Sequence, residues 1–152
     1  MKHKVKEGGK NEQGFTLIEV AMGIAIFAIA VVGIMMTLGH SLTMSTFANN
    51  RATAMNKTQY VIEEVRWLAD TTGLVIMVTT ARNRNWNTWV AQNWVVQDPN
   101  YVALESENIN VTDLNGNNLV NNADPLPVRV SISWSEKGKN TNYAVDTMVT
   151  QR

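Results

Sequence analysis

The sequence lacks cysteine, and its only histidines, His3 and His40, both lie in the first third of the 152 residues. Without cysteine there are no disulfides, no thiolate metal sites and no thiol nucleophiles. Without histidine after residue 40, nucleophile–histidine pairs and imidazole metal sites are unavailable in the rest of the chain. These absences indicate a protein that is not an enzyme.

The sequence also has few prolines and no net charge. No proline occurs in residues 15–98, and thirteen basic residues balance thirteen acidic ones. A neutral chain has no overall field to attract nucleic acid or an acidic membrane. The charge is uneven locally, because the first ten residues carry four lysines, whereas residues 98–124 carry five carboxylates and no basic residue.

One long apolar run interrupts this otherwise polar sequence. Residues 20–38, VAMGIAIFAIAVVGIMMTL, are nineteen residues without a charge. As a helix they span about 28 Å, close to the hydrocarbon thickness of a bilayer. Lysines precede the run and the first basic residue after it is Arg51, so the positive-inside rule places the N-terminus in the cytoplasm.

Two simpler interpretations compete with a processed membrane helix. A cleaved signal peptide would use the small-x-small sequence at Ala28-Ile29-Ala30, but VVGIMM follows, so the cut would fall inside the apolar run. A plain uncleaved anchor fits the hydropathy, but it leaves Glu19 at the membrane edge unexplained.

Glu19 stands in the stretch GFTLIEV, residues 14–20, at the start of the apolar run. A carboxylate near lipid is costly, so Glu19 is expected either to be solvated at the headgroup boundary or to have a partner. A cut after Gly14 would make Phe15 a new N-terminus with a cationic amine. Phe15 and Glu19 are four residues apart on one helical face, so the amine could pair with Glu19 in the same chain or in a neighbour. The cut would also remove the lysines of the leader.

KNEQGFTLIEV followed by the apolar run resembles the type IV prepilin signature, over roughly the first 40 residues. The resemblance implies that a prepilin peptidase cuts between Gly14 and Phe15 and methylates the amine of Phe15. It also implies that Glu19 pairs with the N-terminus of an adjacent subunit. The short chain without cysteine is similar to a minor pilin of the PilV type or a type II secretion pseudopilin of the GspI type.

The partners implied are the prepilin peptidase, the major and minor pilins or pseudopilins of the same machine, an inner-membrane assembly platform and, before assembly, the bilayer. The implied location is the bacterial inner membrane, with a single pass, a cytoplasmic N-terminus and a periplasmic head, and then the pilus or pseudopilus.

One departure from the type IV prepilin pattern is the missing proline, which many major pilins carry in this helix. The alternative function is a membrane-tethered periplasmic module that contacts DNA or glycan and has no filament role.

The rest of the chain predicts an α+β fold, in which one helix over about 15–72 packs against a small antiparallel sheet. Its domains would be a removed leader (1–14), a membrane or filament-core half-helix (15–39), an amphipathic half-helix (40–72) and a β-rich head (73–152). Gly73 suits a left-handed helix cap. Strands are predicted over 128–134 and 143–149 by period-two alternation, with a third over 101–111.

Apolar or small residues are expected to form the buried helix face, and polar ones, among them Lys57, the other faces. The expected apolar positions are Phe47, Ala54, Met55, Ile62, Val65, Leu68 and Ala69.

Three further groups of residues were candidates for chemistry. A calcium loop would use Asp113, Asn115, Asn117, Asn121 and Asp124, but its glycine is misplaced and it has only two charges, so a plain turn fits better. In another segment basic residues precede aromatic ones, which is typical of single-stranded nucleic acid binding. Glycan contact is a second candidate role, but packing or subunit contact fits the shared helical face better. The residues of this segment are Arg82, Arg84, Trp86, Trp89 and Trp94. Glu105 and Glu107 fit a solvated strand face better than a catalytic pair.

Overall fold

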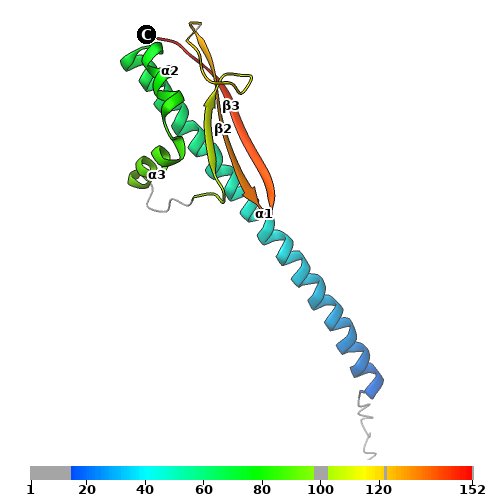
Figure 1. Ribbon diagram of the computed structural model, residues 1–152. Coiled ribbons are helices and arrows are strands. Elements are labelled where there is room, and N and C mark those ends of the chain that lie inside the picture. Colours follow the sequence, from blue (N-terminus) through cyan, green and yellow to red (C-terminus); the bar gives the residue numbers. More distant parts are fainter. Residues whose placement is uncertain (1–14, 98–102, 122, 152) are drawn as a thin grey trace, which may run out of the picture. The chain divides into compact units, whose positions relative to one another are not determined.

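The computed structural model describes residues 15–97, 103–121 and 123–151 (Figure 1). Its elements, in chain order, are α1 (Leu17–Thr72), α2 (Leu74–Asn83), α3 (Trp86–Gln97), β1 (Asn108–Thr112), β2 (Leu126–Glu136) and β3 (Lys139–Val149). One long N-terminal helix packs against a small three-stranded antiparallel sheet. The predicted α+β, pilin-like fold class is therefore confirmed.

Helix α1 has 56 residues, which at 1.5 Å per residue gives a length of about 84 Å. The chain divides into two compact units, Met1–Ser45 and Thr46–Arg152, and α1 contributes to both. The absence of proline along α1 permits this length, because no residue removes a backbone donor from the helix.

The part of α1 in the first unit is apolar and exposed. An 18-residue window has a mean hydropathy of 2.6, and none of that window is buried. The Thr37 hydroxyl, the one polar side chain of the run, donates to the carbonyl oxygen of Gly33 at 2.9 Å. By length and composition, this helix can cross a membrane.

The second unit contains the sheet, in the order β1-β2-β3, with both pairs of neighbours antiparallel. β2 alternates strictly between buried and half-buried residues, as its sequence predicts. The β2–β3 hairpin turns through Lys137 and Gly138, whose φ angles of 51° and 75° are both positive, as in a type I′ turn. The two predicted strands and the turn between them are confirmed.

The third predicted strand is shorter than expected. β1 covers Asn108–Thr112, residues 103–107 form a turn, and residues 101–102 lie outside the described part of the chain. The turn has a local cause, because the Glu107 carboxylate accepts the N–H of Leu104 at 2.9 Å and Ser106 has a φ of 52°. These interactions bend the backbone that the sequence pattern predicted to be extended.

The core of the second unit lies between α1, α2, α3 and one face of the sheet. The predicted helix face is largely correct, since Ala54, Ile62, Val65, Leu68 and Ala69 are all buried. Two predicted positions are wrong, because Phe47 and Met55 are 41% and 44% exposed. The prediction for Lys57 is also wrong, because its side chain is fully buried and does not lie on a polar helix face.

Gly73 separates α1 from α2 instead of leading directly into strands. Its φ of 83° is positive, but its ψ of 161° is not that of the left-handed helical cap we predicted. Gly73 N–H still donates to the carbonyl of Ala69 at 3.0 Å, and a second helix begins at once with Leu74. Helix α2, which buries Leu74, Met77 and Val78, was not predicted from the sequence.

Candidate functional site: the start of the long helix

The carboxylate of Glu19 caps the N-terminus of α1. Its Oε2 accepts two hydrogen bonds from Thr16, one from the backbone N–H and one from the hydroxyl, each 2.9 Å long. In return, the N–H of Glu19 donates to Oγ1 of Thr16 at 3.4 Å. This reciprocal arrangement is a capping box, in which threonine and a glutamate three residues later satisfy otherwise unpaired helix donors.

The capping box gives Glu19 a partner, Thr16, that was not predicted from the sequence. The Thr-x-x-Glu spacing of Thr16 and Glu19 was the signal that could have identified it. The remaining oxygen of Glu19, Oε1, accepts no hydrogen bond from the described part of the chain. Phe15 precedes the box and is 87% exposed, and Gly14, the other residue of the predicted cleavage site, lies outside the described residues.

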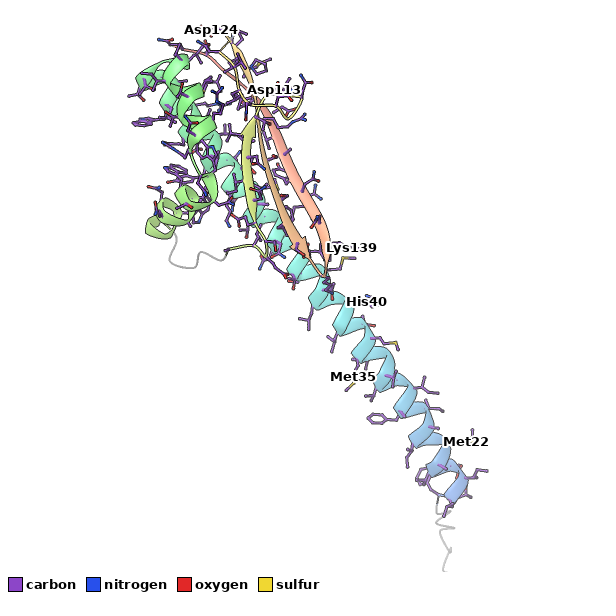
Figure 2. All side chains as sticks on the ribbon, viewed as in Figure 1. Met22, Met35, His40, Asp113, Asp124 and Lys139 are labelled. Carbon is purple, nitrogen blue, oxygen red and sulfur yellow. The ribbon has the colours of Figure 1, made fainter. Side chains whose placement is uncertain are left out.

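An apolar surface follows the capping box along the first unit's helix, and Figure 2 shows its side chains projecting from the ribbon near Met22 and Met35. With the exception of the half-buried Val31, the isoleucine, methionine, valine, leucine and phenylalanine side chains here are each more than half exposed. Such a continuous apolar surface is far larger than soluble monomers present, and it marks a surface that is covered by lipid or protein. Its members between residues 17 and 38 are Leu17, Ile18, Val20, Met22, Ile24, Ile26, Phe27, Ile29, Val32, Ile34, Met35, Met36 and Leu38.

The tryptophan-rich segment lies in the second unit, where its side chains contact α1. The Arg84 guanidinium pairs with the carboxylate of Glu64 at 2.6 Å and lies 5.0 Å from the ring centre of Trp86 and 5.2 Å from that of Trp89. Trp86 is only 3% exposed, and its indole N–H donates to the carbonyl of Ala81 at 2.9 Å. Arg84 and Trp86 therefore join α2, α3 and α1.

Tyr60 of α1 meets the other two tryptophans. Its ring stacks on Trp89, with centres 5.0 Å apart, and contacts Trp94 edge-on at 5.1 Å. Both tryptophans are partly buried against the core. Arg82 differs from these residues because it is exposed at the end of α2.

The asparagine-rich loop is organised by Asp113. The Asp113 Oδ1 atom accepts the N–H groups of Asn115 and Asn117, each at 2.8 Å. These hydrogen bonds, above all the one from Asn117, lower the pKa of the Asp113 carboxyl. Asp124 accepts a hydrogen bond from the Thr150 hydroxyl at 2.8 Å, and Asn121 is exposed.

Asp113 and Asp124 lie at the end of the sheet opposite Lys139 (Figure 2). Within the described residues, no three acidic or histidine side chains gather closely enough to hold a metal ion. The Asp113 carboxylate serves the loop itself, and calcium binding by this loop stays a prediction.

Glu107 is nearly buried and does not lie on the solvated strand face that was predicted for it. Its carboxylate pairs with the ammonium of Lys57 at 2.5 Å, and the two side chains are 8% and 0% exposed, respectively. Glu105 is exposed, so the two glutamates do not share a solvated strand face. The Lys57–Glu107 pair joins α1 to the turn that precedes β1.

Residues 9–35 match the family model of the prokaryotic N-terminal methylation motif. The matched segment includes Gly14, Phe15, Thr16 and Glu19. No curated protein and no solved structure matches the chain significantly. The motif supports a type IV prepilin-like protein that is processed by prepilin peptidase, and together with the apolar helix it supports a single-pass membrane anchor.

Proposed function

We propose that this type IV prepilin-like chain is a minor pilin or pseudopilin, a structural subunit of a type IV pilus or a type II secretion pseudopilus. Prepilin peptidase cuts between Gly14 and Phe15 and methylates the new amine of Phe15. The N-terminus of the precursor is cytoplasmic and the second unit periplasmic. The mature subunit assembles with other pilins or pseudopilins through its N-terminal helix and Glu19.

The exposed apolar helix of the first unit, headed by the Thr16–Glu19 capping box, carries this proposal. An apolar helix surface needs lipid before assembly and the helices of neighbouring subunits afterwards. Removal of the lysine-rich leader takes away the charges that hold the precursor across the membrane. The same helix can then move from lipid into a filament.

The geometry of Glu19 accommodates both an internal and an external partner. A carboxylate has about four acceptor positions, and the two hydrogen bonds from Thr16 both use Oε2. Oε1 remains to accept the methylated ammonium of a neighbour's Phe15 while Thr16 keeps its own bonds. In this proposal Glu19 stabilises the helix start in every subunit and pairs subunits in the filament.

Mass spectrometry of the protein recovered from its bacterial membrane tests the processing. The expected mature chain begins at Phe15 and carries one additional methyl group. A chain that retains Met1, or one that begins after Ala30, would contradict the proposal and favour a tethered module.

A Glu19→Val variant tests the assembly step separately from cleavage. Cleavage is expected to persist because Gly14 and Phe15 are unchanged, while incorporation into sheared filaments falls. Asp70→Asn, an exposed carboxylate near the other end of the same helix, is the matched control and is expected to leave incorporation unchanged. Equal incorporation of the Glu19→Val protein and the unsubstituted protein would show that Glu19 has no assembly role.

A further inference from the structure

A polar groove of about 350 Å³ lies where the corner between α2 and α3 faces β1. Figure 1 shows α2 and α3 on the side of the sheet where β1 forms the edge. The volume falls within the range of about 300–1,000 Å³ that is typical of small-molecule sites. Six asparagines line it, namely Asn83, Asn85, Asn87, Asn108, Asn110 and Asn118.

The groove has fixed walls. The side-chain amide of Asn87 bonds to the backbone on β1 and just before it, accepting the N–H of Ile109 at 2.7 Å and donating to the carbonyl of Glu107 at 3.1 Å. Asn85 Oδ1 accepts the N–H of Thr88 at 3.0 Å, which fixes the start of α3. These bonds reduce the ordering cost that a ligand would otherwise impose on binding.

Four of the six asparagines are available to a ligand. Asn83, Asn108, Asn110 and Asn118 are exposed, and their side-chain amides make no hydrogen bond to the described part of the chain. Each carboxamide presents two donors and one acceptor oxygen. A hydroxyl group matches such amides because it both donates and accepts, and a sugar carries several hydroxyls.

The charge of the groove selects among sugars. Arg82 and Arg84 belong to its lining, and among the described lining residues there is no carboxylate. Glu64 neutralises Arg84 through the 2.6 Å ion pair, whereas Arg82 forms no ion pair with a described residue. One uncompensated guanidinium favours one carboxylate on the ligand, which it can bind through two parallel hydrogen bonds.

The groove lacks what single-stranded nucleic acid requires. Binding of that kind stacks bases on exposed aromatic faces along a strongly basic track. Trp86, the one aromatic residue among the described lining residues, is 3% exposed, and Trp89 is stacked on Tyr60. An amide-rich surface with one available cation does not suit a polyphosphate.

We propose that this groove binds an acidic oligosaccharide. The asparagine amides contact its hydroxyls, and Arg82 contacts the carboxylate of a uronic acid residue. The site lies wholly in the second unit and does not depend on cleavage or filament assembly.

Calorimetric titration of the full chain, purified in detergent, tests the site with two probes, digalacturonate and the hyaluronan disaccharide. At least one is expected to bind, and neutral lactose is expected to bind at least tenfold more weakly. Arg82→Gln should reduce affinity for the acidic probe to the level of lactose. Lack of binding by both probes, equal affinity for lactose, or tighter binding of oligothymidine would overturn the proposal.

Asn110→Asp tests the groove, and Asn142→Asp is its matched control. Both asparagines are exposed on edge strands opposite a serine of β2, Ser131 and Ser133, respectively, but only Asn110 lines the groove. The new carboxylate in the groove should weaken binding of the acidic probe at least tenfold, while Asn142→Asp should leave it unchanged. Equal effects of the two variants, with tryptophan fluorescence confirming the fold of each, would contradict the site.

Discussion

Substitution of Glu107 by glutamine removes the negative charge beside the buried ammonium of Lys57 and leaves a side chain of nearly the same shape. The two groups are 2.5 Å apart, and their side chains are 0% and 8% exposed. Glu107 also holds the turn before β1, because its carboxylate accepts the N–H of Leu104 and its carbonyl accepts the Asn87 amide. Loss of the charge therefore acts on the contact with Lys57 of α1 and on the turn before β1.

The expected cost follows from the separation and the burial. At 2.5 Å and an effective dielectric constant of about 20, the attraction between two unit charges is about 7 kcal/mol. Desolvation of the ions, at several kcal/mol each, offsets most of this attraction in the intact pair. Glutamine at residue 107 removes the attraction but leaves the desolvation of Lys57 in place. We expect the free energy of unfolding to fall by about 3–5 kcal/mol.

Urea denaturation of the full chain in detergent, followed by tryptophan fluorescence, measures this change. The matched control is Glu105→Gln, an exposed glutamate two residues away, which should change stability by less than about 0.5 kcal/mol. The double variant Lys57→Met/Glu107→Leu should recover most of the loss, because an apolar pair has no charge to desolvate. If Glu107→Gln were no more destabilising than Glu105→Gln, the ion pair would not stabilise the second unit.

Three other predictions concern the helix start, the sheet and the junction between α1 and α2. Glu19→Gln keeps an acceptor for Thr16 but removes the charge, so incorporation into filaments should fall. Thr16→Val keeps the charge on Glu19 and should retain most of the incorporation. Immunoblots of sheared filaments compare the two variants. The bidentate bond from Arg129 lowers the pKa of Asp146, so its stabilising effect is present above the usual aspartate pKa and is lost as the pH falls through the lowered value. Denaturation midpoints of the protein and an Asp146→Asn variant should therefore differ at neutral pH and converge in strong acid; a constant difference would contradict this. Gly73→Ala should lower the unfolding free energy by about 1–3 kcal/mol, because φ of 83° with ψ of 161° is accessible almost only to glycine; an unchanged midpoint in thermal denaturation would refute it.

The elements that the sequence predicted well are those whose pattern and burial agree along a single segment. Val128, Val130 and Ile132 alternate with polar residues and face the core, and the two-residue turn at Lys137 and Gly138 sets the register of β2 against β3. In such a segment one burial direction determines both the type of element and its orientation. Contacts with distant parts of the chain were therefore not needed to predict these two strands.

Helix α2 shows where this reasoning fails. Its sequence, LVIMVTTARN, is rich in β-branched residues, which disfavour a helix by intrinsic propensity. Its buried residues Leu74, Met77, Val78 and Ala81 nevertheless follow helical spacing, so packing overrides propensity. The spacing was present in the sequence, but Gly73 was interpreted as the end of the helical region.

Contacts between distant segments could not be predicted from local pattern. Lys57 and Glu107 are fifty residues apart and each is individually typical of a solvated surface. The groove likewise combines the α2–α3 corner with β1 and Asn118, and its character comes from asparagines that are unremarkable one at a time. Only the packing of α2 and α3 beside β1 places these amides around one space.

The Thr16–Glu19 contact is the opposite case, because the residues are three apart and the sequence contained the whole signal. The partner predicted for Glu19 was the amine released by cleavage, whereas the structure adds Thr16 of the same helix start. The two partners are compatible, since Thr16 bonds to Oε2 and leaves Oε1 without a bond to any described residue. A helix start already capped by its own carboxylate holds that carboxylate in one orientation before a neighbour arrives. If Glu19 pairs with the ammonium of a neighbour as proposed, this pairing requires less ordering of the side chain, which lowers the entropic cost of adding a subunit.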